Sequence, residues 1–151
     1  MFIERRMKLK CMVSINYCWR RCFLTRREEA ERLLERSKKF LETADYQIER
    51  GFYDLAAFSL EQSLQLFLKA RLLEYGADYP RTHSVRVLLE VLASIAPENK
   101  RGAIRALLNK NILELGILED AYITSRYVMR DFGREEVERL KKAVVELMNK
   151  C

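Results

Sequence analysis

Apolar residues recur at steps of three and four along most of the chain, from about residue 25 onward. This spacing places apolar side chains on one face of an α-helix. Thr25 followed by Glu28 forms a capping box, so we predict that the first helix begins there. Its apolar face continues to Gly51, a residue suited to ending a helix.

The same spacing predicts four further helices. The second, over about residues 53–75, is apolar around most of its circumference and must be covered on more than one side. We therefore place it at the centre of a bundle or at an interface between subunits. Gly76 and Pro80 interrupt the pattern, and Gly116 is a candidate kink in the fourth helix. The remaining predicted helices span about residues 85–95, 100–128 and 133–150.

These segments predict an all-α fold class: an up-and-down four-helix bundle with an additional short helix. Only five Gly and two Pro occur in 151 residues, too few for the tight turns of an all-β chain. A chain of this length can bury one sizeable core, so one domain over residues 25–151 is expected. Frequent Glu, Lys and Arg beside few Asn and Gln are typical of a thermophile protein.

Residues 1–24 have a different composition and are expected to form a basic, poorly ordered leader. Residues 1–27 carry eight Lys or Arg and one acid, whereas residues 28–151 carry 20 bases and 21 acids. The positive charge is therefore concentrated in residues 1–27, and because the rest of the chain is nearly neutral, the net charge of +6 says little about what the helical part binds. An internal start at Met12 is an alternative interpretation of the leader.

A protein that lacks residues 1–24 is expected to keep its fold and nearly the same melting temperature. The physical reason is that a terminal segment without a regular apolar face contributes little to a core. Thermal melts of the full-length and truncated proteins, followed by circular dichroism, check this expectation. A loss of several degrees would show that the leader packs against the helices.

Three of the four cysteines lie in the leader, at Cys11, Cys18 and Cys22, and Cys151 ends the chain. Their spacing contains no C-x-x-C pair and no histidine is near, so surplus thiols are favoured over a metal site. No cofactor is expected. The apolar run of the leader is too short and polar for a membrane span or a signal peptide, which predicts a cytoplasmic protein without membrane contact.

Three short motifs occur in order along the predicted helices. GFYDLAAF leads into EQSLQLFLKA within residues 51–70, PRTHSV lies at residues 80–85, and YITSRY lies at residues 122–127. In this order they resemble the HEPN domain family, whose members are helical bundles and include subunits paired with nucleotidyltransferases. The resemblance extends over about residues 26–150. It implies a homodimer, a small nucleotidyltransferase as partner and a toxin–antitoxin system as the setting.

Ribonucleases of this family carry an Arg followed after four to six residues by a His. The Arg can bind a phosphate with two hydrogen bonds, and the His can move a proton near neutral pH. Arg126 matches the Arg, but Asp131, Phe132 and Gly133 occupy the positions where the His should fall. Aspartate is ionised at neutral pH and would repel a phosphate. The sequence therefore argues against metal-independent RNA cleavage by one subunit.

His83, Arg126 and Tyr127 are the candidate nucleotide-binding residues. Arg126 can bind a phosphate, and the Tyr127 ring can stack on a base. Alternatively, Arg126 complements the helix dipole beside Glu119 or Asp120, and Tyr127 belongs to the core or to an interface. His83 is the only histidine, and it either contacts a nucleotide or a partner or holds the turn before the third helix through hydrogen bonds.

Polar side chains also interrupt the apolar second helix. They can form a small pocket that bonds a base or a ribose, or they are exposed or satisfy one another across a helix pair. Lys69 and Arg71 on the same helix carry the same two interpretations, with a solvated face preferred. The polar positions are Glu61, Gln62, Ser63 and Gln65.

The preferred hypothesis is an interaction module that binds a nucleotidyltransferase partner, a nucleotide, or both. The alternative is a metal-independent endoribonuclease with a composite dimer site, to which each of two subunits supplies Arg126. A plain nucleotide-binding or scaffold domain is a third hypothesis. The sequence has no glycine-rich phosphate loop, no Ser-His-Asp or Cys-His constellation in the helical part and no histidine-based metal cluster. No catalytic residue is therefore assigned, apart from Arg126 in the ribonuclease alternative.

Overall fold

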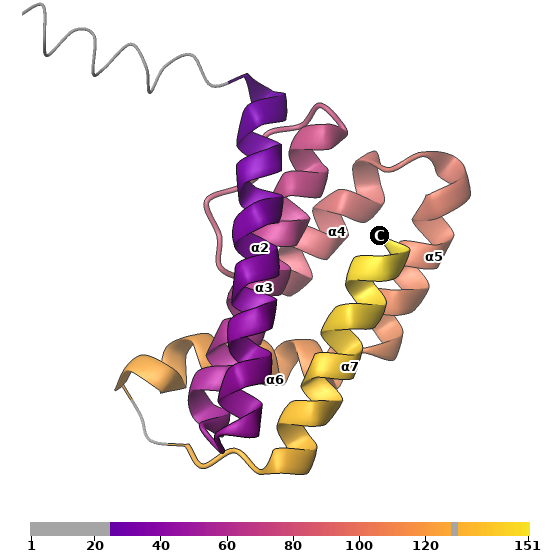
Figure 1. The fold of residues 1–151 in the computed structure, drawn as a ribbon. Helices are drawn as coiled ribbons and strands as arrows, with labels where there is room; N and C mark the ends of the chain where they lie inside the picture. Colours follow the sequence, from indigo (N-terminus) through magenta and orange to yellow (C-terminus); the bar gives the residue numbers. More distant parts are fainter. Residues whose placement is uncertain (1–24, 128–129) are drawn as a thin grey trace, which may run out of the picture.

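The computed structural model describes residues 25–127 and 130–151, with the side chains of residues 125–127 outside the description. The predicted leader over residues 1–24 lies outside the described residues. Within them the chain forms helices and no strand, which confirms the all-α fold class (Figure 1). The helices are α2 (Arg26–Glu49), α3 (Tyr53–Glu74), α4 (Val85–Ile95), α5 (Glu98–Lys110), α6 (Ile112–Tyr127) and α7 (Arg134–Lys150).

Helices α2 and α3 form an antiparallel hairpin whose ends follow local rules. The capping box at Thr25 is confirmed: its side chain accepts from the Glu28 N–H, and the Glu28 carboxylate accepts from the Thr25 N–H at 2.9 Å. Gly51 ends α2 with a φ of 77°, a backbone conformation that residues other than glycine rarely adopt. The N–H of Phe52 then reaches back to the carbonyl of Gln47 at 2.8 Å, which closes the helix end.

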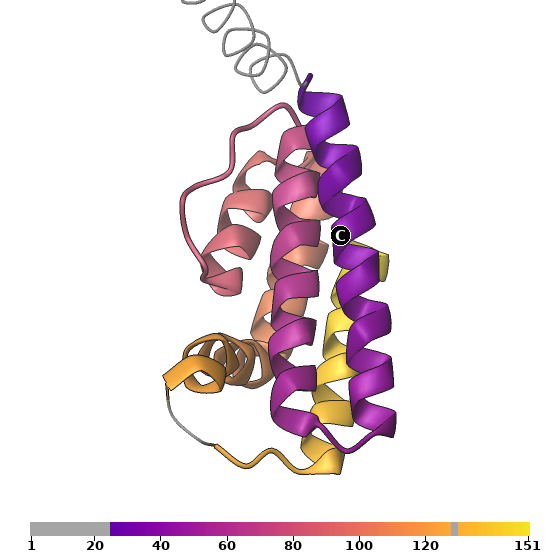
Figure 2. The ribbon, with the colours of Figure 1, turned by 60° about the vertical axis from the view of Figure 1, so that its left-hand side comes forward.

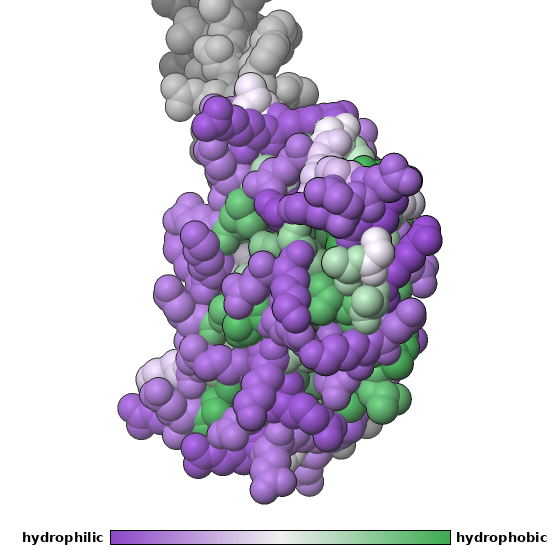
Figure 3. Space-filling model, turned by 90° about the vertical axis from the view of Figure 1, so that its right-hand side faces the viewer, coloured by the Kyte–Doolittle hydropathy of each residue, from purple (hydrophilic) through white to green (hydrophobic). Residues whose placement is uncertain are grey.

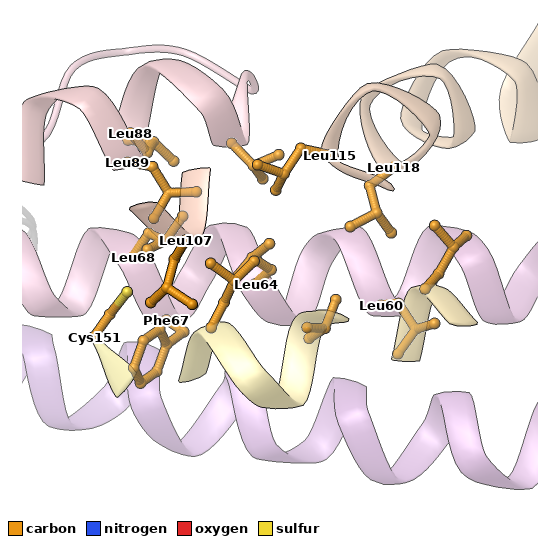
Figure 4. Close-up of a cluster of buried hydrophobic side chains, with 14 of the residues drawn as sticks. Leu60, Leu64, Phe67, Leu68, Leu88, Leu89, Leu107, Leu115, Leu118 and Cys151 are labelled. Atoms are coloured by element: carbon orange, nitrogen blue, oxygen red, sulfur yellow. The ribbon is translucent and has the colours of Figure 1, made fainter. Parts of the chain in front are cut away.

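Helix α3 is the central helix, as its broad apolar surface predicted. It packs against α2, α4, α6 and α7, and Figure 2 shows it between its neighbours. Leucines at every fourth position, from Leu60 to Leu72, have no exposed area. Figure 4 shows how Leu60, Leu64 and Leu68 meet leucines of α4, α5 and α6. Burial on several sides makes α3 the scaffold on which any site of this domain is built.

Two serines hold α2 close to α3. The hydroxyl of Ser37 donates to the carbonyl of Ser63 at 2.7 Å, and the hydroxyl of Ser63 donates to the carbonyl of Ser37 at 2.8 Å. Both residues are fully buried, so these reciprocal bonds satisfy polar groups that would otherwise be costly in the core. Ser63 therefore serves the helix pair and does not contribute to a polar pocket.

The prediction of a single helix over residues 100–128 is wrong, because the structure contains two helices there, α5 and α6. The chain leaves helical geometry at Asn111, whose buried side chain donates to the carbonyl of Leu107 at 3.0 Å. Asparagine competes for backbone groups in this way and so weakens a helix at its own position. Gly116, the predicted kink, lies inside α6. Helix α6 turns across the lower end of the bundle in Figure 1, so it does not continue the up-and-down arrangement.

Helix α7 closes the bundle and its end is tied to α3. The guanidinium of Arg71 donates to the carbonyl of Cys151 at 2.9 and 3.3 Å and pairs with Glu74. Arg71 is therefore a structural residue and not part of a free solvated face. Figure 3, which shows the side that lies to the right in Figure 1, has hydrophilic side chains around small apolar areas. That face offers no extended apolar surface.

Candidate functional site

A row of polar residues runs along α3 on the side that faces α6 and the start of α4. Glu61, Gln65 and Lys69 are spaced by four residues, which places them one above the other on the helix. Glu61 and Gln65 are buried, with exposed fractions of 0% and 4%, whereas Lys69 is half-buried. The row therefore leads from the surface of the protein into its apolar interior.

The amide of Gln65 connects the members of this row. Its nitrogen donates to Glu61 Oε1 at 2.8 Å, and its oxygen accepts from Lys69 Nζ at 3.1 Å. An ammonium group can only donate, so the Gln65 oxygen must face Lys69 and its nitrogen must face Glu61. The second carboxylate oxygen of Glu61 accepts from the side chain of Gln62 at 2.7 Å. Both oxygens of the buried carboxylate are thus bonded.

His83 joins this row from the segment between α3 and α4. Its Nδ1 lies 3.4 Å from the amide nitrogen of Gln65, and its Nε2 lies 3.2 Å from the hydroxyl of Tyr122 on α6. The Gln65 nitrogen is a donor, and it lies 3.4 Å from the backbone carbonyl of His83 as well. His83 is exposed and its ring stacks on Tyr122 with the centroids 4.4 Å apart. On α3, Phe58 stacks on Tyr122 with the centroids 6.3 Å apart.

Glu119 ties the start of α4 to α6 and so fixes the segment that holds His83. It accepts from the Ser84 hydroxyl at 2.5 Å and from the guanidinium of Arg86 at 2.8 Å. The Ser84 hydroxyl also caps α4 by accepting from the N–H of Val87. Burial alone would raise the pKa of Glu119, but hydrogen bonds from Arg86 and Ser84 outweigh it and hold that pKa below its usual value.

The pKa of Glu61 is shifted in the direction opposite to that of Glu119. Burial raises its pKa from 4.5 to about 7, although hydrogen bonds from Gln62 and Gln65 and the charge of Lys69 act in the other direction. Burial also lowers the pKa of Lys69. A carboxyl group with a pKa near neutrality can take up or release a proton under ordinary conditions, and groups of this kind are concentrated at functional sites.

We call six residues the polar cluster: Glu61, Gln62, Gln65, Lys69, His83 and Tyr122. Among the sequence-derived candidates, His83 lies at its centre. Arg126 and Tyr127 belong to the last turn of α6. Arg126 follows Tyr122 by four residues, so the backbone places it on the same side of α6 and one turn further along.

The sequence interpretation missed Tyr122 and the proton-accepting character of Glu61. Both carried a signal. Tyr122 precedes Arg126 by one helical turn within the YITSRY motif, and Glu61 is an acidic residue inside the most apolar helix of the chain. The structure shows Glu119 bound by Arg86 and Ser84, whereas the side chain of Arg126, for which Glu119 was a candidate partner, lies outside the described residues.

A hollow lies between α2 and α7, away from the polar cluster. This open groove has a volume of about 630 Å³ and an apolar floor that includes Ile48 and Val145. Several of its charges are already paired: Lys141 lies 2.7 Å from Asp45, and Glu146 bonds Lys110 and Lys150, which lower its pKa to about 2. Its charged groups therefore hold the helices together, and the polar cluster remains the better candidate site.

The described part of the chain contains no cluster of candidate metal ligands and no candidate membrane-spanning helix. Its His, Cys, Asp and Glu residues form no group of three or more with a geometry suited to a metal ion. No helix described here has the length and hydrophobicity needed to span a membrane.

The geometry defines the class of protein as a helical bundle with a polar cluster beside its central helix. The family model for the HEPN domain matches residues 30–151, which include every member of the polar cluster. The chain therefore belongs to the HEPN domain family, and the resemblance of its three motifs is confirmed. No curated protein matches the chain.

Proposed function

We propose that this HEPN domain binds a nucleotide at the polar cluster and works as the helical partner of a small nucleotidyltransferase. The observation that supports binding most directly is the exposed His83, which stacks on Tyr122 and bonds Gln65. Aromatic faces of this kind hold bases by stacking, and amide groups read base edges or ribose hydroxyls. The cluster therefore combines the contacts that a nucleoside requires.

Arg126 supplies the phosphate contact in this proposal. One helical turn separates it from Tyr122, a rise of about 6 Å along the axis of α6. A single nucleotide can span this separation, with its base near His83 and Tyr122 and its phosphate at Arg126. Lys69 adds a positive charge on α3. Tyr127 follows Arg126 directly and is the candidate for a second stacking contact.

The partner proposal rests on family membership and on the outer side of α6. Leu113 is 75% exposed and Ile123 is 57% exposed, so this helix presents apolar side chains that another protein can cover. We propose a homodimer and a nucleotidyltransferase partner for these surfaces, within a cytoplasmic toxin–antitoxin system of a thermophile. Co-purification with a nucleotidyltransferase encoded beside this gene tests that pairing.

The ribonuclease alternative remains the second candidate, because His83 and Glu61 are two proton carriers in one cluster. A composite site across a dimer would add Arg126 from each subunit. The residues at the positions of the missing histidine do not supply a substitute for it, because Phe132 is buried in the core and Asp131 is an exposed carboxylate. We propose that the isolated subunit does not cleave RNA without a metal, because no histidine follows Arg126 at the family's spacing, and loss of the acid–base help that such a histidine gives lowers rates by about a hundred- to ten-thousandfold.

Arg126→Ala separates these functions. Wild-type protein is expected to bind ATP and a short oligoadenylate weakly, and the variant about ten- to a hundredfold more weakly, because a hydrogen bond to a charged group contributes about 1.5–3 kcal/mol. Isothermal titration calorimetry measures both affinities. Incubation of the same proteins with single-stranded RNA and a chelator is expected to leave the RNA intact.

Arg105→Ala is the matched control, since Arg105 is an exposed arginine of α5 outside the polar cluster. It is expected to bind both ligands as the wild type does. Equal affinities for wild type and Arg126→Ala would contradict the phosphate role. Robust RNA cleavage that disappears in Arg126→Ala would replace the binding proposal with the ribonuclease alternative.

A further inference from the structure

The buried carboxyl group of Glu61 is connected to the surface through one amide. Glu61 has no exposed area, whereas His83 is exposed, and the Gln65 nitrogen contacts both of them. A ligand at His83 therefore does not touch Glu61, but it lies one side chain away. Because Glu61 is buried, water screens its charge less than it screens a surface charge, so Glu61 responds to a ligand charge that arrives nearby.

The charged groups around Glu61 do not fix whether its carboxyl group is ionised. Lys69 on the same helix and Glu119 on α6 act on it with opposite signs. Glu119 is in turn neutralised by Arg86 of α4. Helices α2 and α7 meet α3 on its opposite side, where the hydroxyl of Ser63 contacts Ser37 and the sulfur of Met148. No described ion pair holds Glu61 permanently in its charged form.

We propose that Glu61 takes up a proton when an anionic nucleotide binds at the polar cluster, so that binding is coupled to pH. This inference rests on the nucleotide-binding function proposed above and adds its regulation. The phosphate of a nucleotide bound between His83 and Arg126 brings negative charge towards the buried carboxylate. Protonation of Glu61 removes that repulsion, and burial already makes the protonated form accessible near neutral pH.

The hydrogen bonds also indicate which oxygen receives the proton. Gln65 is held by Lys69 as well as by His83, so its nitrogen must keep donating to Oε1 of Glu61. Gln62 has Oε2 of Glu61 as its hydrogen-bond partner among the described contacts. Its amide can therefore turn and present its oxygen to a new O–H group. The proton is therefore placed on Oε2 of Glu61, because the amides of Gln62 and Gln65 both keep a hydrogen bond to the carboxyl group in that arrangement.

Calorimetry with a short oligoadenylate that ends in hydroxyl groups tests this coupling, because its phosphodiesters keep their charge across the range. At constant salt, wild-type binding is expected to be about five- to tenfold tighter near pH 6 than near pH 8.5. The reason is that a shift of one pKa unit corresponds to about a tenfold change in affinity. Titrations near pH 7.5 in two buffers of different ionisation enthalpy should reveal proton uptake by the complex, without any variant.

Glu61→Gln keeps the size and hydrogen-bonding groups of the side chain but cannot ionise. It is expected to bind near pH 8.5 about as tightly as wild type binds near pH 6, with no proton uptake. His83→Gln should bind more weakly yet keep the pH dependence. The inference would be overturned, and His83 would be the group that takes up the proton, if the affinity still depended on pH in Glu61→Gln but not in His83→Gln. Binding that is independent of pH in the wild type overturns the coupling alone, whereas no binding at any pH overturns the proposed function as well.

Discussion

Glu61→Gln is expected to raise the melting temperature of the protein near pH 8 by roughly ten degrees. The carboxyl group has a pKa of about 7 in the folded chain and an ordinary value of 4.5. Such a group stabilises the fold fully below its unfolded pKa, and this contribution is lost as pH rises through the folded pKa. Above neutral pH the cost of the buried charge is about 3 kcal/mol, which glutamine does not incur.

The size of this stabilisation depends on pH in a way that a packing change would not reproduce. The gain from Glu61→Gln should shrink between about pH 7 and pH 4.5 and vanish below that range, where the wild-type carboxyl group is neutral in both states. Thermal melts across this range measure it. Such a stabilising substitution at a candidate site is the usual signature of a residue kept for function at the expense of stability.

Glu119→Gln is the matched control because the same chemical change should have the opposite sign. Hydrogen bonds from Arg86 and Ser84 hold the pKa of Glu119 below its usual value. Its charge therefore stabilises the fold above pH 4.5, and that contribution is lost as the pH falls. The variant should melt below the wild type near pH 8. A lower melting temperature for Glu61→Gln near pH 8 would mean that the ionised carboxylate is required by the fold.

Leu64→Ala is expected to destabilise the protein by about 3 kcal/mol and to lower its melting temperature by roughly ten degrees. Leu64 lies on α3 with no exposed area, among leucines of neighbouring helices (Figure 4). Its truncation removes apolar contacts and leaves a cavity that a close-packed core fills only in part. Urea denaturation should show a lower midpoint with an unchanged slope.

Leu113→Ala provides the comparison for this core substitution. Leu113 is 75% exposed on α6, so its truncation should change the free energy of unfolding by less than about 0.5 kcal/mol. Equal effects of the two substitutions would show that α3 is not the central helix. A large effect of Leu113→Ala alone would show that the partner surface of α6 is covered in solution.

Much of the fold could be predicted from the sequence because it depends on short-range rules. The capping box at Thr25, the helix end at Gly51 and the central position of α3 each follow from residues that are close together in the chain. The three motifs were sufficient to indicate the family that the comparison confirms. Helix periodicity and capping act within one or two turns, so the amino-acid order contains this information directly.

Contacts between residues far apart in the chain were decided by the tertiary structure alone. Periodicity could not tell that the chain turns at Asn111 and carries α6 across the bundle. It placed Glu61 and Ser63 on the same helix but could not say that Ser63 bonds α2 while Glu61 points towards the side of His83. The direction of a side chain about its own helix axis is a local property. What that side chain meets depends on how all the helices pack, and packing is settled only when the whole core is buried together.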